Sequence, residues 1–327
     1  MRRVAGIWLL LALAAGVVGF IALSVGSAGF DAATAWKALF VFNHPAHDLI
    51  VRLRLPRISS GFVVGALLST AGALLQLLLR NPLAEPYVLG LSGGAALGAL
   101  AALTLAASSA WVGVAAALGA LVSLGVLLLV AAREFRVVDY QGAGERLLLS
   151  GVMLAALWGA LITLLLSISE VGRMQALIFW LMGELSGAQG GVGAWLALVF
   201  ILLAAAWDAP RLNILLRGDD VAAALGIHVG ALKRRVVILS ALAAGCAVAI
   251  AGTVGFVGLV APHLVRVLWG NDQRMLLPAS ALLGGTAVIL ADTVARTIVA
   301  PQQLPVGAVT AALGAPLFLY LLWRERR

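Results

Sequence analysis

Residues 208–235 read DAPRLNILLRGDDVAAALGIHVGALKRR, and they form the longest polar interruption in the second half of an otherwise apolar chain. They carry five of the 22 Lys and Arg residues. Within them, Asp219 and Asp220 are candidates to cap a helix, the segment 221–225 favours helix, and Gly226 occupies the position of a left-handed C′ residue. The pattern predicts a short helix in a polar connection. It leaves open whether that helix contacts a protein or lies on lipid headgroups.

The composition places this connection in a membrane protein. Of 327 residues, 63% are hydrophobic and 11% are charged, whereas a soluble domain carries about 25% charged residues. No stretch is polar and long enough for a separate soluble domain, so we expect one transmembrane domain over 1–327. The net charge of +8 fits a cytoplasmic excess of Lys and Arg better than nucleic-acid binding.

The apolar segments predict an all-α fold of ten spans with both termini in the cytoplasm, since each span needs about 20 apolar residues. Segment 255–268 is short and rich in glycine, which is typical of a broken helix buried among neighbours. Segments 30–42 and 172–185 are expected to form external helices. The spans are expected at 4–25, 55–79, 88–105, 110–132, 147–166, 192–207, 236–254, 255–268, 275–297 and 306–322.

The positive charges support this orientation. It places six of the 22 cationic residues outside and leaves the other sixteen inside, as the positive-inside bias requires. If 255–268 did not cross, the C-terminal arginines would face outward and the bias would weaken. The six outside residues are Lys37, Arg52, Arg54, Arg57, Arg173 and Arg296.

Sequence motifs of common enzymes are missing. The only lysines are Lys37, which precedes Ala, and Lys233, which precedes Arg, so the chain has no Walker-A loop. His44 and His47 lie near Asp48 but lack a fixed third ligand, so we predict no metal site. The sequence thus offers no recognisable nucleotide-binding or metal-binding motif.

Asp292 is the clearest acidic residue within a span, and Arg296 follows it one helical turn later. An i,i+4 ion pair is the simpler interpretation. A proton relay is the alternative, and it would suit a secondary transporter that works without an ATPase.

Glycines recur within the spans, as at 61 and 65, at 90, 94 and 98, and at 252, 255 and 258. The segment from Gly90 to Gly94 has the look of a phosphate-binding loop. Small residues four apart in an apolar helix more often permit close helix packing, and this is the interpretation we favour.

The external arginines run against the topological bias, so another factor should retain them. Arg52, Arg54 and Arg57 precede the second span, and Arg296 ends the ninth. A soluble partner with acidic surface residues would explain this cluster. Exposed charge pairs of this kind would orient the partner and speed its association more than they would raise its affinity. Phospholipid headgroups are the competing explanation.

Several motifs resemble a known permease family. They are RLPR at 54–57, RNPLAEP at 80–86, LGLSGGAA at 89–96, GFVGLVAPHLVR at 255–266, LADTVAR at 290–296, LPVG at 304–307 and LGAP at 313–316. In this order they resemble the FecCD-type permeases, which import ferric siderophores, haem and cobalamin. The resemblance covers nearly the whole chain.

This resemblance implies a ten-span subunit of a type II ATP-binding-cassette (ABC) importer in the bacterial cytoplasmic, or inner, membrane. It would work as a homodimer or paired with a homologous permease, and it would itself be neither an enzyme nor the carrier of a cofactor. Two cytoplasmic ATPase subunits would bind ATP and Mg²⁺, and an extracytoplasmic binding protein would deliver the cargo. No nucleic-acid partner is implied, and membrane lipid surrounds the subunit.

The resemblance also assigns residues to roles. The connection at about 208–235 would be the coupling loop that docks on the ATPase, through Asp219, Asp220, Leu225, Gly226, Ile227 and His228. Arg54, Arg57 and Arg296 would pair with glutamates of the binding protein. The segment near Gly144 and Glu145 would form the cytoplasmic gate, although no family signature stands there.

The walls of the translocation path would be the fifth span, the helix at 172–185 and the tenth span. Ferric siderophore is the first expectation for the cargo because it is the commonest cargo of the family. Haem and cobalamin are the alternatives, and His44, His47 and His263 do not discriminate among them.

Overall fold

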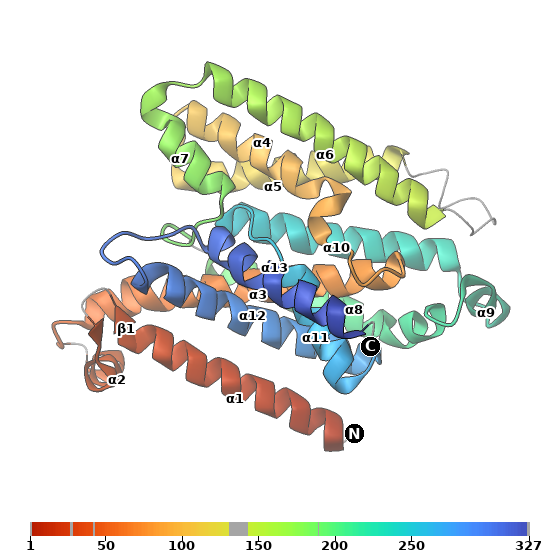
Figure 1. The fold of residues 1–327 in the computed structure, drawn as a ribbon, viewed down its shortest axis with the longest axis horizontal. Helices are drawn as coiled ribbons and strands as arrows, with labels where there is room; N and C mark the ends of the chain where they lie inside the picture. The colour runs from red at the N-terminus through yellow and green to blue at the C-terminus, as the bar shows by residue number, and fades with distance from the viewer. Residues whose placement is uncertain (1, 27–28, 42, 131–142, 189, 326–327) are drawn as a thin grey trace.

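The structure, a computed structural model, describes residues 2–26, 29–41, 43–130, 143–188 and 190–325. Within these ranges the chain is a bundle of helices with one small hairpin (Figure 1). The hairpin joins β1 (Val25–Gly26) to β2 (Gly29–Phe30), which pair antiparallel with Val25 opposite Phe30. The expected all-α class is therefore confirmed for the described residues.

The helices follow the apolar segments closely. Their bounds are α1 Arg2–Ser24, α2 Ala32–Phe40, η1 Leu49–Arg54, α3 Leu55–Leu78, η2 Pro86–Leu89, α4 Leu91–Thr104, α5 Ser109–Val130, α6 Ala143–Ile168, α7 Val171–Leu181, α8 Gly191–Leu215, α9 Asp219–Ala224, α10 Val229–Ala251, α11 Val257–Trp269, α12 Gln273–Thr297 and α13 Val306–Glu325. η1 is a π-helical turn and η2 a 3₁₀ turn. Asp31 caps the start of α2 by accepting a hydrogen bond from the Thr34 amide at 2.9 Å.

Seven of the described helices are long and apolar enough to cross a membrane. Helices α4, α7, α11 and the part of α13 from Val306 to Leu321 are also apolar but shorter. The expected count of ten spans therefore depends on the shorter helices and is not established by length alone.

Helix α3 is the centre of the bundle, and nearly all of its apolar stretch is buried. It packs against α10, α11 and α12, and small residues allow the close approach. A Cβ atom added at Gly65 would lie 2.2 Å from the carbonyl oxygen of Gly284 on α12. Gly65 thus serves helix packing, as predicted.

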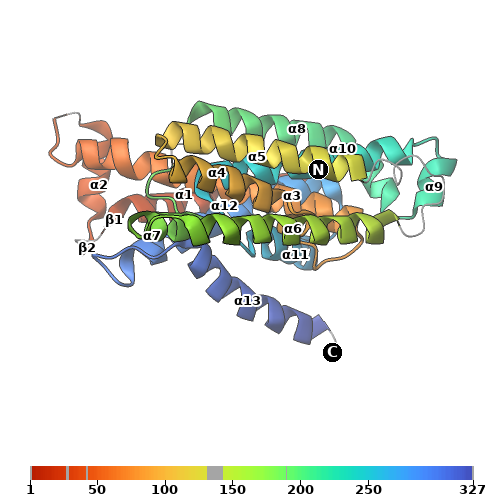
Figure 2. The ribbon, with the colours of Figure 1, turned by 90° about the horizontal axis from the view of Figure 1, so that it is seen from above.

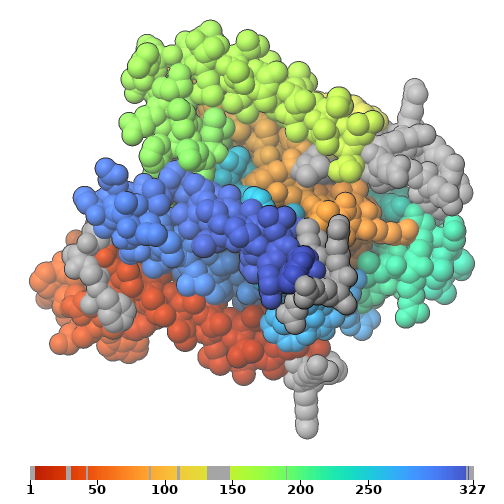
Figure 3. Space-filling model, in the orientation of Figure 1, coloured from red at the N-terminus to blue at the C-terminus, as the bar shows by residue number. Residues whose placement is uncertain are grey.

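The outer helices expose apolar side chains. Helix α1 lies along one edge of the bundle and α6 along the opposite edge (Figure 1). Helix α13 diverges from the bundle when it is seen from above (Figure 2) and lies across the front of the space-filling view (Figure 3). Such apolar outer faces suit lipid or another membrane protein.

The two ends of the bundle differ. Helix α2 and the hairpin lie at one end, which we call the α2 end, and α9 lies at the other, which we call the α9 end (Figure 1). The first residues of α1 and the last of α13 lie towards the α9 end (Figures 1 and 2).

Helices are interrupted at two glycines within the bundle. Gly90, with φ of 73°, separates η2 from α4, and Gly252, with φ of 67°, ends α10. Phe256 has a φ of 67° just before α11. The expected broken helix at 255–268 is therefore observed, and the expected continuous span at 88–105 is interrupted at Gly90.

The expected polar connection at 208–235 is mostly helical, which corrects the sequence-based prediction. Helix α8 continues to Leu215 and α10 begins at Val229. The helices extend past their apolar parts because their polar residues pair with one another: Asp208 binds Arg211 and Arg235. Only 216–228 lies outside these two long helices.

Candidate functional site

Helix α9 is a short helix held between two turns at the α9 end. Gly218, with φ of 128°, precedes it, and Gly226, with φ of 78°, follows its C-cap Leu225. The Gly226 amide donates to Ala223 O at 2.9 Å, and the Ile227 amide donates to Ala222 O at 3.0 Å. These two bonds form a Schellman motif, so the predicted left-handed role of Gly226 is confirmed.

The outer face of α9 is apolar. The side chain of Leu225 is 64% exposed and that of Val221 is 43% exposed, while Asp220 and His228 are also exposed. Beside them lies an open depression of about 610 Å³, lined by Leu225, Gly226, Ile227, His228, Ala231, Leu232, Arg211, Arg234 and Arg235. An exposed apolar side chain with a basic border can accept a complementary protein surface.

Asp219 does not belong to this outer face. Its side chain is buried, Gly218 is the N-cap of α9, and no side chain caps that helix. The Asp219 carboxylate instead binds the Arg80 guanidinium at 2.5 Å and the Lys233 ammonium at 2.5 Å. The capping role predicted for Asp219 and Asp220 is therefore wrong, because both are helical residues of α9. Two cations from other elements draw the Asp219 carboxylate inward.

A second buried carboxylate lies near the same end. Asp208 binds Arg211 at 2.8 Å and Arg235 at 3.1 Å, so it ties α8 to α10. The spacing between Asp208 and Arg211 hints at the first pair, but the second pair depends on the tertiary fold.

At the α2 end, Asp292 lies between two arginines. The Arg57 guanidinium donates to both Asp292 oxygens at distances of 2.8 to 3.0 Å, and Arg296 Nε lies 3.2 Å from Oδ2. All three side chains are largely buried. The predicted ion pair of Asp292 and Arg296 is present, and the bidentate contact with Arg57 is a further component that sequence spacing did not reveal.

Two arginines also hold the end of α1. Arg54 Nη1 donates to Leu23 O at 2.6 Å, and Arg296 Nη2 donates to Ala22 O at 3.0 Å. These carbonyls belong to the last turn of α1, which has no intrahelical donors for them. Positive groups are also favourable at the negative end of a helix dipole.

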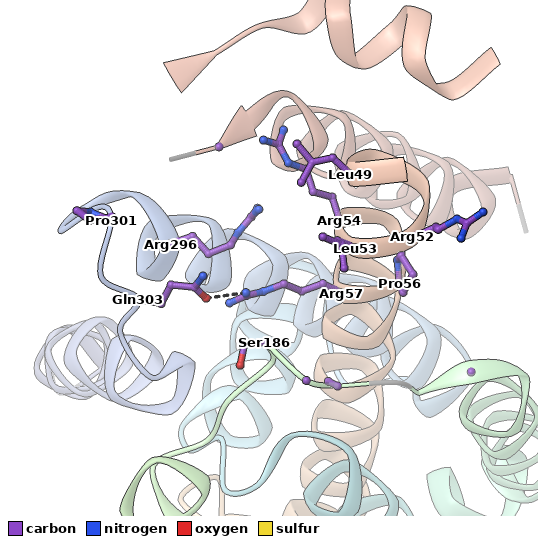
Figure 4. Close-up of a pocket in the computed structure, with 14 residues that line it drawn as sticks. Leu49, Arg52, Leu53, Arg54, Pro56, Arg57, Ser186, Arg296, Pro301 and Gln303 are labelled. Atoms are coloured by element: carbon purple, nitrogen blue, oxygen red, sulfur yellow. Dashed lines mark hydrogen bonds between the residues drawn. The ribbon is translucent and has the colours of Figure 1, made fainter. Parts of the chain in front are cut away.

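The same arginines line an open depression of about 610 Å³ at the α2 end, together with Ser186, Pro301 and Gln303. Figure 4 shows that Arg57 and Arg296 approach each other there, whereas Arg52 points away. Arg52 pairs with Asp48 at 2.9 Å, and both side chains are mostly exposed. Arg57 also donates to Gln303 Oε1 at 2.7 Å. The structure thus brings the predicted Arg54, Arg57 and Arg296 together.

Gly144 and Glu145 lie in the first turn of α6. Their side chains are outside the described part of the structure, so the predicted gate stays a prediction.

The histidine pair has other contacts. His44 Nδ1 accepts a hydrogen bond from the Ala46 amide at 3.1 Å, and His47 Nδ1 lies 2.7 Å from Ala38 O. No group of three or more His, Cys, Asp or Glu residues suited to a metal occurs among the described residues.

One set of contacts escaped the sequence-based prediction. Glu85 Oε1 accepts a hydrogen bond from the Phe256 amide at 2.6 Å. The Tyr87 hydroxyl donates to Val254 O at 2.9 Å and accepts from the Val254 amide at 2.7 Å. The segment after α3 therefore holds the break before α11. Glu85 lies within the RNPLAEP motif, which was the one available signal.

Comparison with known proteins gives a consistent result. The model of the FecCD transport family matches residues 12–324. Two curated relatives are the vitamin B12 import system permease protein BtuC of Vibrio vulnificus, 39% identical, and the hemin transport system permease protein HmuU of Yersinia pestis, 40% identical. The first alignment covers 85% of this chain and 84% of the relative, and the second covers 84% and 83%.

A solved structure agrees with these relatives. It is described as an inward-facing conformation of a metal-chelate type ABC transporter, with a TM-score of 0.80 and 31% sequence identity. The match covers 98% of this chain and 99% of the other. The similarity therefore extends over the whole arrangement of helices.

Proposed function

The chain belongs to the FecCD transport family, and from this premise we propose that it is the transmembrane permease subunit of an ABC importer in the cytoplasmic membrane. The observation that carries the proposal is the match of nearly the whole chain in both sequence and fold. ATP hydrolysis takes place on partner chains. The missing Walker-A loop fits this division of labour.

Ten crossings are the topology we propose. They comprise the seven long apolar helices together with α4, α11 and α13. Both termini and α9 then face the cytoplasm, and α2 and α7 face outward. The positions of α2 and α9 at opposite ends of the bundle support this arrangement (Figure 1).

We propose that the ATPase docks on the outer face of α9. Leu225 and Val221 supply an exposed apolar contact, and the adjacent depression has a basic border. Asp220, Gly226, Ile227 and His228 lie at or beside this surface. Asp219 takes no direct part in the contact, because its carboxylate is turned inward to Arg80 and Lys233.

We propose that the binding protein docks at the α2 end, over the depression that Arg54, Arg57 and Arg296 line. Acidic residues on the binding protein would complement these cations. Arg57 and Arg296 already share Asp292 as an ion-pair partner, so they mainly hold the shape of the basic surface. Arg54 has no carboxylate partner among the ion pairs described above, so it would contribute more of the contact with the binding protein.

A second permease subunit completes the path in this proposal. Helices α6 and α13 carry exposed apolar side chains, such as Leu157 on α6 and Leu319 on α13. Helix α7 would also contribute to the wall, at its outer end. Two such faces opposed across a twofold axis would enclose a weakly binding apolar path. Gly144 and Glu145 would stand at its cytoplasmic mouth.

The cargo we propose is a bulky metal chelate. Cobalamin is the first candidate because several relatives are named for its import, and haem is the second because a relative of 40% identity is named for hemin transport. Ferric siderophore, the expectation based on family frequency, becomes the third. Uptake of labelled cyanocobalamin, haemin and a ferric hydroxamate by cells with and without this gene tests the order. Loss of cobalamin uptake alone is expected, and unchanged uptake of all three chelates would contradict the proposal.

The alternative function is a proton-coupled secondary transporter that uses Asp292. The structure gives it little support, since two guanidinium groups engage both oxygens of that carboxylate. Such a group suits an anchor between α3 and α12 better than a proton carrier.

A further inference from the structure

We propose that Asp219 is a positioning residue that fastens α9 to the segment 76–87, through which displacement of α9 reaches α13. This inference rests on the proposed docking of an ATPase on α9. It assigns to Asp219 the transmission of motion and leaves ATPase binding to the exposed Leu225 surface.

The first step of the connection is the cluster of Arg80, Asp219 and Lys233. Both Asp219 oxygens are bound, one by each cation, at 2.5 Å. Arg80 also donates to Leu215 O, at the end of α8, at 3.4 Å. The Asp219 carboxylate is buried and the Arg80 side chain is half exposed, and a buried charge is costly to leave without its partners. Helix α9 and the end of α3 should therefore move together.

The backbone of Arg80 supports a role beyond packing. Its φ is 48°, in the left-handed region that non-glycine residues seldom adopt. Arg80 and Asn81 occupy the C′ and C″ positions after α3, because their amides donate to Leu77 O at 3.3 Å and Gln76 O at 3.1 Å. Glycine is the usual residue at C′. Arg80 adopts this conformation while its side chain binds Asp219, and strain of this kind occurs preferentially at functional positions.

The second step runs from segment 76–87 to the start of α11. Gln76 Nε2 donates to Leu259 O at 3.2 Å, Glu85 accepts from the Phe256 amide, and Tyr87 bonds both backbone groups of Val254. Arg266 of α11 donates to Gln76 Oε1 at 3.0 Å. Side chains on both sides of Arg80 thus hold α11 and the break before it.

The third step joins α11 to α13. A Cβ atom added at Gly314 of α13 would lie 2.6 Å from Cβ of Phe256, so the backbone of α13 packs closely against the Phe256 side chain at the N-cap of α11. The rings of His263 and Phe318 meet edge to face, with centroids 5.3 Å apart. Helix α13 is one of the proposed walls of the path, and it meets the bundle through α11 and α12. A shift of α11 should therefore displace α13.

The Asp219→Asn variant tests the proposal in the complete transporter, with its ATPase and binding protein, in proteoliposomes. Spin labels at Ala206 of α8 and Ala312 of α13, both exposed, are placed in a background where Cys246 is Ser. The readout is the change in label distance between the nucleotide-free and the ATP–vanadate states, together with ATP hydrolysis. The ATP–vanadate state traps the nucleotide and needs no cargo.

We expect Asp219→Asn to bind the ATPase and hydrolyse ATP, but to lose the distance change. The fraction of transporters that switch should fall about tenfold, within the range of coupling between sites in proteins. Retention of the full distance change would overturn the proposal. Loss of ATPase binding would also overturn it, because Asp219 would then belong to the docking surface.

Two further variants guard against a general structural effect. Arg80→Gly removes the same link but suits the left-handed backbone, so it should fold well and lose the distance change equally. Asp208→Asn removes another buried carboxylate with two cationic partners, but that carboxylate joins α8 to α10, so the distance change should remain. Equal loss in Asp208→Asn, or an intact change in Arg80→Gly, would contradict the inference. If the unsubstituted complex neither binds the ATPase nor switches, the proposed function itself fails.

Discussion

At the scale of single residues, Asp292 joins three helices at the α2 end. It binds Arg57 of α3 and Arg296 of α12, and Arg296 also holds the last turn of α1. Removing the carboxylate leaves two buried guanidinium groups without a counter-charge.

Asp292→Ala should therefore destabilise the protein strongly, by about 3–5 kcal/mol as expected for breaking a buried pair. Thermal unfolding in detergent measures the effect. Glu170→Ala is the control, because it breaks the exposed pair of Glu170 and Arg173 and should cost about 0–1 kcal/mol. Equal losses in the two variants would contradict the assigned role of Asp292.

Arg54 provides the second prediction at this scale. Arg54→Glu should weaken docking of the binding protein, and the loss should shrink at high salt because exposed charges are screened. Surface plasmon resonance at low and high salt measures it. Lys37→Glu makes the same charge change on exposed α2, outside the depression, and should have little effect. An unchanged affinity in Arg54→Glu would indicate that the arginine serves lipid headgroups or the end of α1.

The spacing of charged residues in the sequence predicted some of these ion pairs. The i,i+4 spacing revealed the pair of Asp292 and Arg296, since it is local to one helix. It did not reveal the partner Arg57, which lies on another helix far away in the sequence, nor the inward turn of Asp219 towards Arg80. Contacts of this kind depend on which helices become neighbours, and periodicity does not encode that.

At the scale of elements, α9 separates two tasks on one short helix. Its outer face offers Val221 and Leu225, and its inner face carries Asp219 and Ala222. The sequence predicted the element and its left-handed end at Gly226. It also suggested a longer polar connection, because the charged residues at the ends of α8 and α10 resemble loop residues when their ion-pair partners are not known.

Leu225→Asp should abolish association with the ATPase while the permease still folds, because the side chain is 64% exposed and contributes little to the core. Co-purification from membranes measures association, and size-exclusion chromatography checks the fold. Leu105→Asp, at an exposed leucine that follows α4, is the control and should retain the ATPase. Normal co-purification of Leu225→Asp would contradict docking on α9.

At the scale of the whole molecule, the fold combines a densely packed centre with outer helices that have fewer neighbours within the subunit. Helix α3 is buried among α10, α11 and α12, while α13 diverges from the bundle (Figure 2). The apolar segments predicted most of the long helices, because a segment within a bilayer must satisfy its own backbone hydrogen bonds and therefore folds as a helix. They did not predict the break at Gly90, since a left-handed glycine leaves no trace in hydropathy.

The measurement that tests the proposed function most directly is uptake by the purified permease in proteoliposomes, with and without its ATPase and binding protein. We expect accumulation of a metal chelate such as cyanocobalamin only when both partners and ATP are present, and no uptake when a proton gradient is imposed on the permease alone. Uptake driven by the proton gradient in the absence of any ATPase would contradict the assignment as an ABC permease.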